Sequence, residues 1–201
     1  MTTPAVIAIV LGYLLGSIPS AYLVGRLGGK IDLTKEGDGH ISATAVYREL
    51  GRIPFILVLL MDAAKGVLAV YVARTLTDSP SILVVTAYAA VIGHCWSVFL
   101  GFKGGLGAVV TYGVLGGIAS REFFIAAAVA LLLFFTTRKS SLSTYILLAT
   151  VSAVLLIERK DLVVVLFPLG LMLISLLKRF QVRKISTAYK NELFDDLKRH
   201  R

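Results

Sequence analysis

Two short polar segments hold most of the residues in this chain that could do chemistry. The first contains Gly37, Gly39 and His40, followed by Thr44 and Arg48. Glycines let an anionic ligand approach bare backbone amides. Thr44 and Arg48 are four residues apart, so they share one face of any helix that forms here and offer a hydroxyl and a guanidinium to a phosphate group. The alternative is a turn that only joins two apolar segments.

The second segment covers residues 93–107 and is richer in glycine. Lys103 is followed directly by Gly104 and Gly105, with Gly107 close behind. Each glycine costs a helix about 1 kcal/mol relative to alanine, so the cluster predicts a loop shaped for a ligand. Free amides at the start of the next helix favour an anion such as phosphate, and His94 could hydrogen-bond or accept a proton near neutral pH. Close helix packing through small residues is the alternative.

A third pair of charged residues lies inside an apolar run. Asp62 and Lys65 are three residues apart, so a helix would place them on one face. Ionisable groups are costly in hydrocarbon, and we therefore expect an ion pair that faces the protein interior. A direct catalytic role for the two residues is the alternative.

The elements that must position these residues are apolar. The 201 residues are 57% hydrophobic and only 16% charged, with a mean hydropathy of +0.83, whereas a soluble domain carries about a quarter charged residues. The apolar residues form long runs, which predicts an all-α, polytopic membrane protein with about seven transmembrane helices. The predicted spans are residues 4–24, 54–73, 81–100, 108–119, 123–135, 142–157 and 162–177.

The basic residues predict the orientation of these spans. Sixteen lysines and arginines fall on one side of the predicted membrane and four on the other, with Lys65 inside the second span. The positive-inside rule places the sixteen in the cytoplasm, with the N-terminus outside and the C-terminus inside. The loops at 26–53 and 101–107 are then cytoplasmic, and the net charge of +9 needs no nucleic-acid partner. A single cysteine, Cys95, excludes an internal disulfide.

The last segment, residues 178–201, is predicted to be a cytoplasmic tail outside the transmembrane domain of residues 1–177. Ile185, Tyr189, Leu193 and Leu197 recur every fourth residue and form one apolar stripe of a helix. We expect this amphipathic helix to lie along the inner membrane surface. A frayed polar tail is the alternative.

Four ordered stretches, at residues 16–25, 32–51, 62–66 and 93–107, resemble the PlsY-type glycerol-3-phosphate acyltransferases. The resemblance covers roughly the first 115 residues and implies a seven-span enzyme of the bacterial cytoplasmic (inner) membrane. Such enzymes transfer an acyl chain from acyl-phosphate to the 1-hydroxyl of glycerol 3-phosphate, giving lysophosphatidic acid, without a metal or another cofactor. The implied catalytic residues are His94, Arg48 and Thr44, and the implied substrate-binding residues are Gly37, Gly39, His40, Lys103, Gly104, Gly105 and Gly107.

The chain departs from the family pattern inside these motifs. The family's first loop typically has serine, asparagine, glycine and asparagine where this chain has Asp38, His40, Ser42 and Ala45, and its second loop has lysine in place of Leu106. Leucine cannot bind phosphate, and a carboxylate at Asp38 repels anions. The family's C-terminal arginine-and-asparagine motif has no clean counterpart in residues 178–184. A divergent paralogue without acyl transfer, acting as a lipid-binding or regulatory membrane protein, is therefore the alternative function.

Overall fold

Helices make up the regular secondary structure of the described residues, apart from an isolated bridge between Ser97 and Lys103. The computed structural model describes residues 2–29, 31–33 and 41–199, and only the backbone of residues 140 and 188–199. In chain order the elements are α1 (Thr3–Ser17), α2 (Ser20–Gly29), α3 (Ala43–Leu50), α4 (Arg52–Leu76), α5 (Pro80–Cys95), the 3-10 turn η1 (Val98–Leu100), α6 (Ala108–Ile118), α7 (Ser120–Thr137), α8 (Ser140–Ile157) and α9 (Leu162–Arg199).

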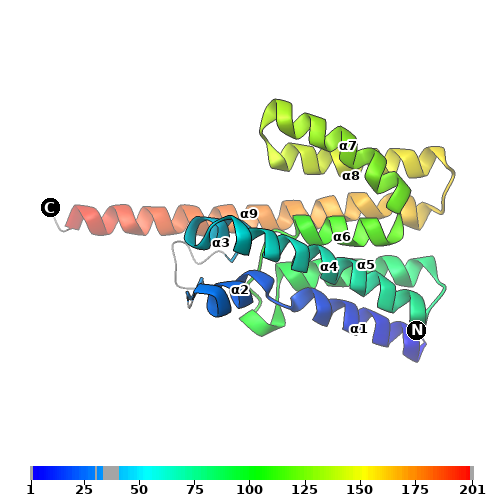
Figure 1. Cartoon of the computed structure of the whole chain (residues 1–201), viewed down its shortest axis with the longest axis horizontal. Coiled ribbons are helices and arrows are strands. Elements are labelled where there is room, and N and C mark those ends of the chain that lie inside the picture. The colour runs from blue at the N-terminus through cyan, green and yellow to red at the C-terminus, as the bar shows by residue number, and fades with distance from the viewer. Residues whose placement is uncertain (1, 30, 34–40, 200–201) are drawn as a thin grey trace.

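Seven apolar helical segments correspond to the seven predicted spans. Four are long and apolar enough to cross a membrane, namely α1 with α2, α4, α7 and the part of α9 from Leu162 to Thr187. The remaining three, α5, α6 and most of α8, are shorter. The segments run back and forth, and the two chain ends lie at opposite ends of the bundle (Figure 1). The all-α polytopic fold is confirmed, while the end that faces the cytoplasm stays a prediction.

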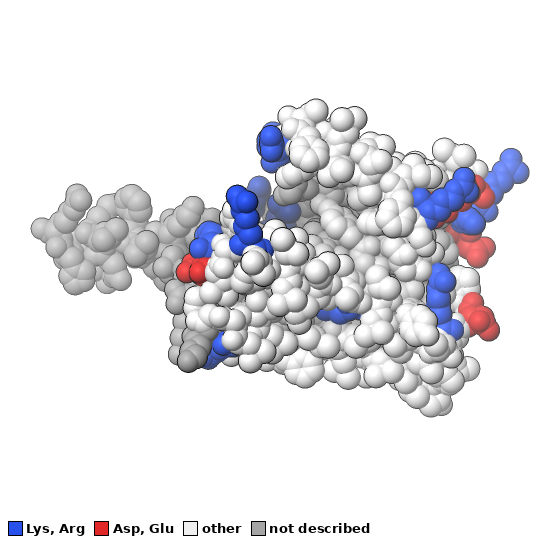
Figure 2. All heavy atoms as spheres, viewed as in Figure 1, with Lys and Arg blue, Asp and Glu red and all other residues white. Residues whose placement is uncertain are grey.

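Charged and apolar side chains are distributed over the surface of the bundle as in a membrane-spanning protein. In the face shown in Figure 2, charged side chains gather at the two ends and leave a nearly uncharged band between them. Large apolar side chains are exposed on the spans, among them Leu60 at 63%, Leu132 at 68% and Leu156 at 63%. Exposed apolar surface of this extent is unfavourable in water and suits contact with lipid chains.

Two predicted spans differ from the structure at the ends that meet the candidate site. The first is broken, because α1 ends at Ser17 and α2 begins only at Ser20. Pro19 lies in the break, and proline disfavours helical backbone in the residue before it. The third predicted span ends at Cys95 instead of residue 100, because the following glycine-rich segment turns back toward α5 and opens α6.

The segment predicted as a C-terminal tail is helical and continues the last span. Helix α9 runs without a break from Leu162 to Arg199, and the position of its last part along the inner membrane surface stays a prediction. The sequence from residue 178 to 199 contains neither glycine nor proline, the residues that most often end a helix. In Figure 1 the last part of α9 extends past the other helices in line with the bundle axis.

Glycines bring α1 and α5 into backbone contact. A Cβ atom at Gly16 would run into the carbonyl group of Ala90, and one at Gly93 would run into the carbonyl group of Tyr13. Gly12 similarly faces Thr86. Small residues let helices approach closely where apolar burial alone cannot drive association in a membrane. This contact fixes the end of α1 beside the end of α5.

A second, smaller core holds α3 in place. It is formed by buried apolar residues of α2, the segment after it, α3 and α4, including Val24, Leu33, Ala45, Val46 and Val58. Ala45 and Val46 point from α3 into this core. The helix therefore packs against α2 and α4 with one face and leaves the other to solvent.

The close α1–α5 contact predicts a strong effect of adding a single methyl group. Gly16→Ala should lower the free energy of unfolding by roughly 1–3 kcal/mol, because the backbone of Ala90 cannot move aside as a side chain can. The matched control is Gly28→Ala in α2, where a Cβ atom meets nothing within 4 Å. Thermal unfolding in detergent should show Gly28→Ala unchanged or slightly stabilised. Equal stability of the two variants would contradict the proposed contact.

Candidate functional site

Lys65 spans the break between α1 and α2. Its Nζ donates a hydrogen bond of 2.9 Å to the carbonyl oxygen of Ile18 and lies 2.9 Å from Oδ1 of Asp62. The Lys65 and Asp62 side chains are 5% and 7% exposed. The buried ion pair expected from the sequence is present, and its lysine also donates to the carbonyl oxygen at the helix break, which accepts a second hydrogen bond of 3.0 Å from the amide of Ser20.

His94 lies on the other side of the Asp62 carboxylate. Its Nδ1 is 3.6 Å from Asp62 Oδ1, slightly beyond hydrogen-bond distance, and its side chain is 15% exposed. The carboxylate therefore faces the Nδ1 edge of the imidazole. The Nε2 edge faces Gly105, where a Cβ atom would run into it. The imidazole is thus held between a carboxylate on α4 and the glycine-rich loop.

The loop from Trp96 to Gly107 folds back onto the end of α5. The amide of Ser97 donates to the carbonyl oxygen of Lys103 at 3.1 Å, and the amide of Gly105 donates to the carbonyl oxygen of His94 at 3.2 Å. A Cβ atom at Gly104 would meet the same His94 carbonyl group, and Gly107 has a φ of +80°. These glycines are required for close packing, and they also bring the loop backbone to the edge of the imidazole.

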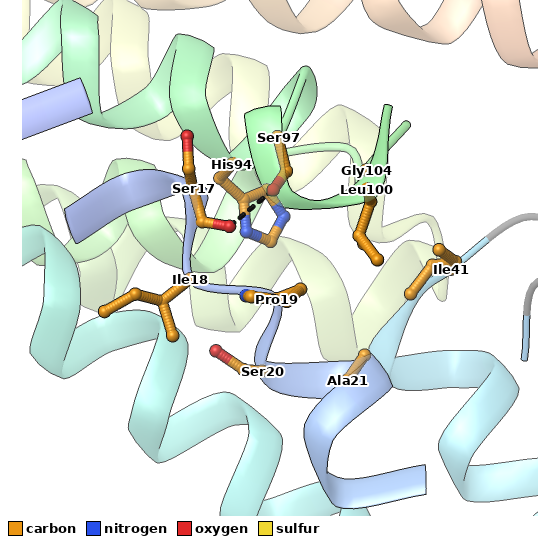
Figure 3. Close-up of a pocket in the computed structure, with 10 residues that line it drawn as sticks. All are labelled: Ser17, Ile18, Pro19, Ser20, Ala21, Ile41, His94, Ser97, Leu100 and Gly104. Atoms are coloured by element: carbon orange, nitrogen blue, oxygen red, sulfur yellow. Dashed lines mark hydrogen bonds between the residues drawn. The ribbon is translucent and has the colours of Figure 1, made fainter. Parts of the chain in front are cut away.

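A small recess lies between the helix break and this loop. It has a volume of about 20 Å³, room for about one water molecule. In Figure 3 the imidazole of His94 points into the recess, and Ser97 Oγ donates a hydrogen bond to the carbonyl oxygen of Ser17 at 2.5 Å. The lining residues are Ser17, Ile18, Pro19, Ser20, Ala21, Ile41, His94, Ser97, Leu100 and Gly104.

An apolar groove of about 630 Å³ opens on the other side of the same break. It runs between α1 and α4, past the exposed side chains of Val67, Leu68 and Tyr71. Ile18 and Ser20 line both the groove and the recess, and Lys65 lines the groove where it meets the break. The break therefore joins an apolar, lipid-facing groove to a polar recess.

Helix α3 begins next to the recess and presents two of the predicted residues to solvent. Ile41 lines the recess, and Ser42 caps α3 by accepting a hydrogen bond from the amide of Ala45 at 3.2 Å. Thr44 and Arg48 lie on the exposed face of α3, as their spacing predicted, and neither lines the recess.

The structure brings only part of the predicted site together. His94 lies against the loop that contains Gly104, Gly105 and Gly107, while the side chain of Lys103 is exposed. The predicted residues Gly37, Gly39 and His40, and the departure at Asp38, lie outside the described residues. Within the described part of the chain, no three histidine, cysteine, aspartate or glutamate side chains gather as metal ligands would.

Two residues of α9 that contact the loop were not predicted from the sequence. Trp96 Nε1 donates to Gln181 Oε1 at 3.0 Å, and Lys178 Nζ lies 5.0 Å from the centre of the Trp96 ring. Lys178 is only 4% exposed. The spacing of three residues between Lys178 and Gln181 was the available signal, because it places them on one helical face. This shared face was overlooked because residue 178 was predicted to start a polar tail.

The ion pair makes a prediction that a double-mutant cycle can test. Asp62→Asn and Lys65→Met should each lower the free energy of unfolding by about 3–5 kcal/mol, since each leaves a buried charge uncompensated. The double variant should lose less than the sum of the two. Thermal unfolding in detergent measures all four proteins. Arg121→Gln, which breaks a 3.5 Å pair with Glu158 at a site where Arg121 is 78% exposed, serves as control and should cost under about 1 kcal/mol. Additive losses would show that Asp62 and Lys65 are not coupled.

Comparisons with known proteins show similarity to one family. Residues 6–187 match the family model described as glycerol-3-phosphate acyltransferase. Glycerol-3-phosphate acyltransferase 2 of Moorella thermoacetica is 43% identical over 120 residues, which cover 60% of this chain and 61% of that protein. The glycerol-3-phosphate acyltransferase of Synechococcus sp. (strain JA-3-3Ab) is 51% identical over 111 residues, covering 55% of this chain and 54% of that protein. The matched part thus spans little more than half the length of these relatives.

Solved structures extend the similarity over the whole fold. The crystal structure of PlsY (YgiH), an integral membrane glycerol 3-phosphate acyltransferase, in its glycerol 3-phosphate form superposes with a TM-score of 0.79 at 27% identity, covering 92% of this chain and 93% of that one. Its lysophosphatidic acid form gives a TM-score of 0.77 at 26% identity, with the same coverage. With the family model matched over nearly the full chain, this multi-pass membrane protein belongs to the glycerol-3-phosphate acyltransferase family.

Proposed function

We propose that this chain transfers an acyl group from acyl-phosphate to the 1-hydroxyl of glycerol 3-phosphate, giving lysophosphatidic acid, in the bacterial cytoplasmic membrane. The observation that carries the proposal is the helix break at Ile18 and Ser20, where the apolar groove and the polar recess meet. A reaction between a lipidic donor and a water-soluble acceptor needs such a junction. The family match and the names of the relatives support the same reaction and do not favour the paralogue without acyl transfer.

The donor's acyl chain belongs in the groove between α1 and α4. The groove is open to the lipid-facing surface of both helices, and its volume of about 630 Å³ lies in the range of pockets that bind small molecules. Its polar members, Lys65 and Ser20, lie where it meets the break. A chain that enters from the membrane would thus place its carbonyl end toward the break and the loop beside His94.

The phosphate groups of both substrates belong on the side of the glycine-rich segments. Arg48 and Thr44 are exposed on α3, and Lys103 extends from the loop that packs on His94. A guanidinium offers bidentate hydrogen bonds to phosphate, and an ammonium adds a point charge. Leu106 replaces the cation expected from the family pattern, so Arg48 and Lys103 carry more of this binding here.

The chemical step requires little acid–base help from the protein. The 1-hydroxyl oxygen attacks the acyl carbonyl carbon, a new C–O ester bond forms, and the bond from that carbon to the phosphate oxygen breaks. The leaving group is phosphate, which takes up the hydroxyl proton, so atoms and charges balance. His94, oriented by Asp62, hydrogen-bonds at the reacting centre. Positioning and charge stabilisation supply the rest of the catalysis.

Acyl transfer by the purified protein tests the proposal directly. With acyl-phosphate and glycerol 3-phosphate the protein should form lysophosphatidic acid. Arg48→Ala should raise the dissociation constant of glycerol 3-phosphate about ten-fold or more, because a hydrogen bond to a charged group contributes ~1.5–3 kcal/mol. Arg52→Ala, an exposed arginine at the start of α4, is the matched control and should bind normally. Absence of product from the folded wild-type protein would instead favour the paralogue without acyl transfer.

A second experiment tests the groove. Ala64 lines it, so Ala64→Trp should shorten the space available to the acyl chain and reduce transfer from a long-chain acyl-phosphate more than from a short-chain one. Leu60→Trp places the same bulk on an exposed part of α4 that does not line the groove. Chain-length preference measured for the three proteins should change only in Ala64→Trp. The same shift in Leu60→Trp would show that the groove does not hold the acyl chain.

A further inference from the structure

A second polar recess lies between α8 and α9, away from the candidate site. It has a volume of about 260 Å³ and is lined by Ser141, Tyr145, Leu176, Arg179, Phe180 and Arg183. None of these residues lines the recess at His94 or the groove between α1 and α4. Lys178 and Gln181, which contact Trp96, are not among them either. The proposed acyl transfer leaves this recess without a role.

Two buried donors in the recess lack hydrogen-bond partners. Arg179 Nε and Tyr145 Oη are both inaccessible to solvent, and neither finds a partner within the described part of the chain. The guanidinium carbon of Arg179 lies 5.9 Å from the centre of the Tyr145 ring, so the two side chains are stacked close together. Buried polar groups are nearly always paired in folded proteins. The two side chains thus carry unused hydrogen-bonding capacity next to the recess, which a ligand with acceptor oxygens would satisfy.

The positive charge of the recess favours an anionic ligand. Arg179 and Arg183 contribute two guanidinium groups, and no carboxylate is found among the described lining residues. Ser141 adds a hydroxyl in the first turn of α8, an 18-residue helix whose N-cap, Lys139, makes no capping hydrogen bond with its side chain. Free amides and the helix dipole at this end also favour negative charge. A phosphate group, with several acceptor oxygens, satisfies these donors together.

The position of the recess favours a phosphate group that belongs to a membrane lipid. Ser141 directly precedes the apolar run of α8 at residues 142–157, and Arg179 and Arg183 follow the apolar run of α9 that ends at Leu177. This is the level at which phospholipid head groups meet hydrocarbon. Next to the arginines, Phe180 and Leu177 are 68% and 56% exposed and offer apolar surface to acyl chains. We propose that the recess between α8 and α9 binds the phosphate group of an anionic membrane phospholipid.

Native mass spectrometry of the delipidated full chain in detergent tests this site. The probes are dioleoylphosphatidylglycerol, dioleoylphosphatidylcholine and inorganic phosphate. The wild-type protein should bind the anionic lipid about ten-fold more tightly than the zwitterionic one. Arg179→Gln with Arg183→Gln should abolish this preference. The control Arg52→Gln removes an exposed arginine elsewhere and should retain it.

A subtler variant covers the case in which the double variant does not fold. Tyr145→Phe keeps the ring that stacks on Arg179 and removes only the unpaired hydroxyl. It should weaken binding of the anionic lipid several-fold while thermal unfolding stays unchanged. An unaltered preference in both the double variant and Tyr145→Phe would overturn the site. Binding of inorganic phosphate as tight as that of the lipid would overturn the lipid and identify a soluble anion as the ligand.

Discussion

One ammonium group in an apolar interior holds the centre of this protein together. Lys65 Nζ contacts the Ile18 carbonyl oxygen at the break of the first span and the Asp62 carboxylate on its own helix. Through Asp62 it is linked to His94 on α5. An isolated buried charge would cost several kcal/mol. The Asp62 carboxylate and the Ile18 carbonyl oxygen, which also accepts from the amide of Ser20, together make the buried ammonium tolerable. Helix break, ion pair and histidine position therefore form one unit.

The glycine contacts determine where that unit lies. Gly16 and Gly93 let α1 and α5 touch backbone to backbone, while Gly66 and Gly113 do the same for α4 and α6. Larger residues would hold these helices further apart and separate the three groups that must meet. The same approach leaves the polar recess on one side of the break and the lipid-facing groove on the other. In the proposed reaction, the water-soluble acceptor and the lipidic donor would reach the break from these two cavities.

Features that depend on neighbouring residues could be predicted from the sequence, whereas contacts between residues far apart in the chain could not. The spans follow from local hydropathy, and the Asp62–Lys65 pair follows from a spacing of three residues. The break after Ser17 was missed, because residues 4–24 read as one apolar run although Pro19 gave a local signal. The partner of Ile18 could not be predicted, because Lys65 is 47 residues away. The contact between Trp96 and Gln181 joins residues 85 apart. Gly37, Gly39 and His40 lie outside the described residues and stay predictions.

The departures from the family pattern do not all bear on the reaction. Ser42 replaces a glycine, yet its backbone is extended, with φ −146°, so glycine is not required there, and its hydroxyl caps α3. Ala45 replaces an asparagine and is buried against the small core under α3, where an apolar side chain avoids an unpaired amide. These two changes act on the scaffold that presents Thr44 and Arg48. Leu106 differs, because it stands where the family pattern has a cation, in the loop that packs on His94. Asp38 and His40 lie outside the described residues. Within the described part of the chain, the departure that bears on the proposed phosphate binding is therefore the one in the glycine-rich loop, because the departures at Ser42 and Ala45 act on the scaffold of α3.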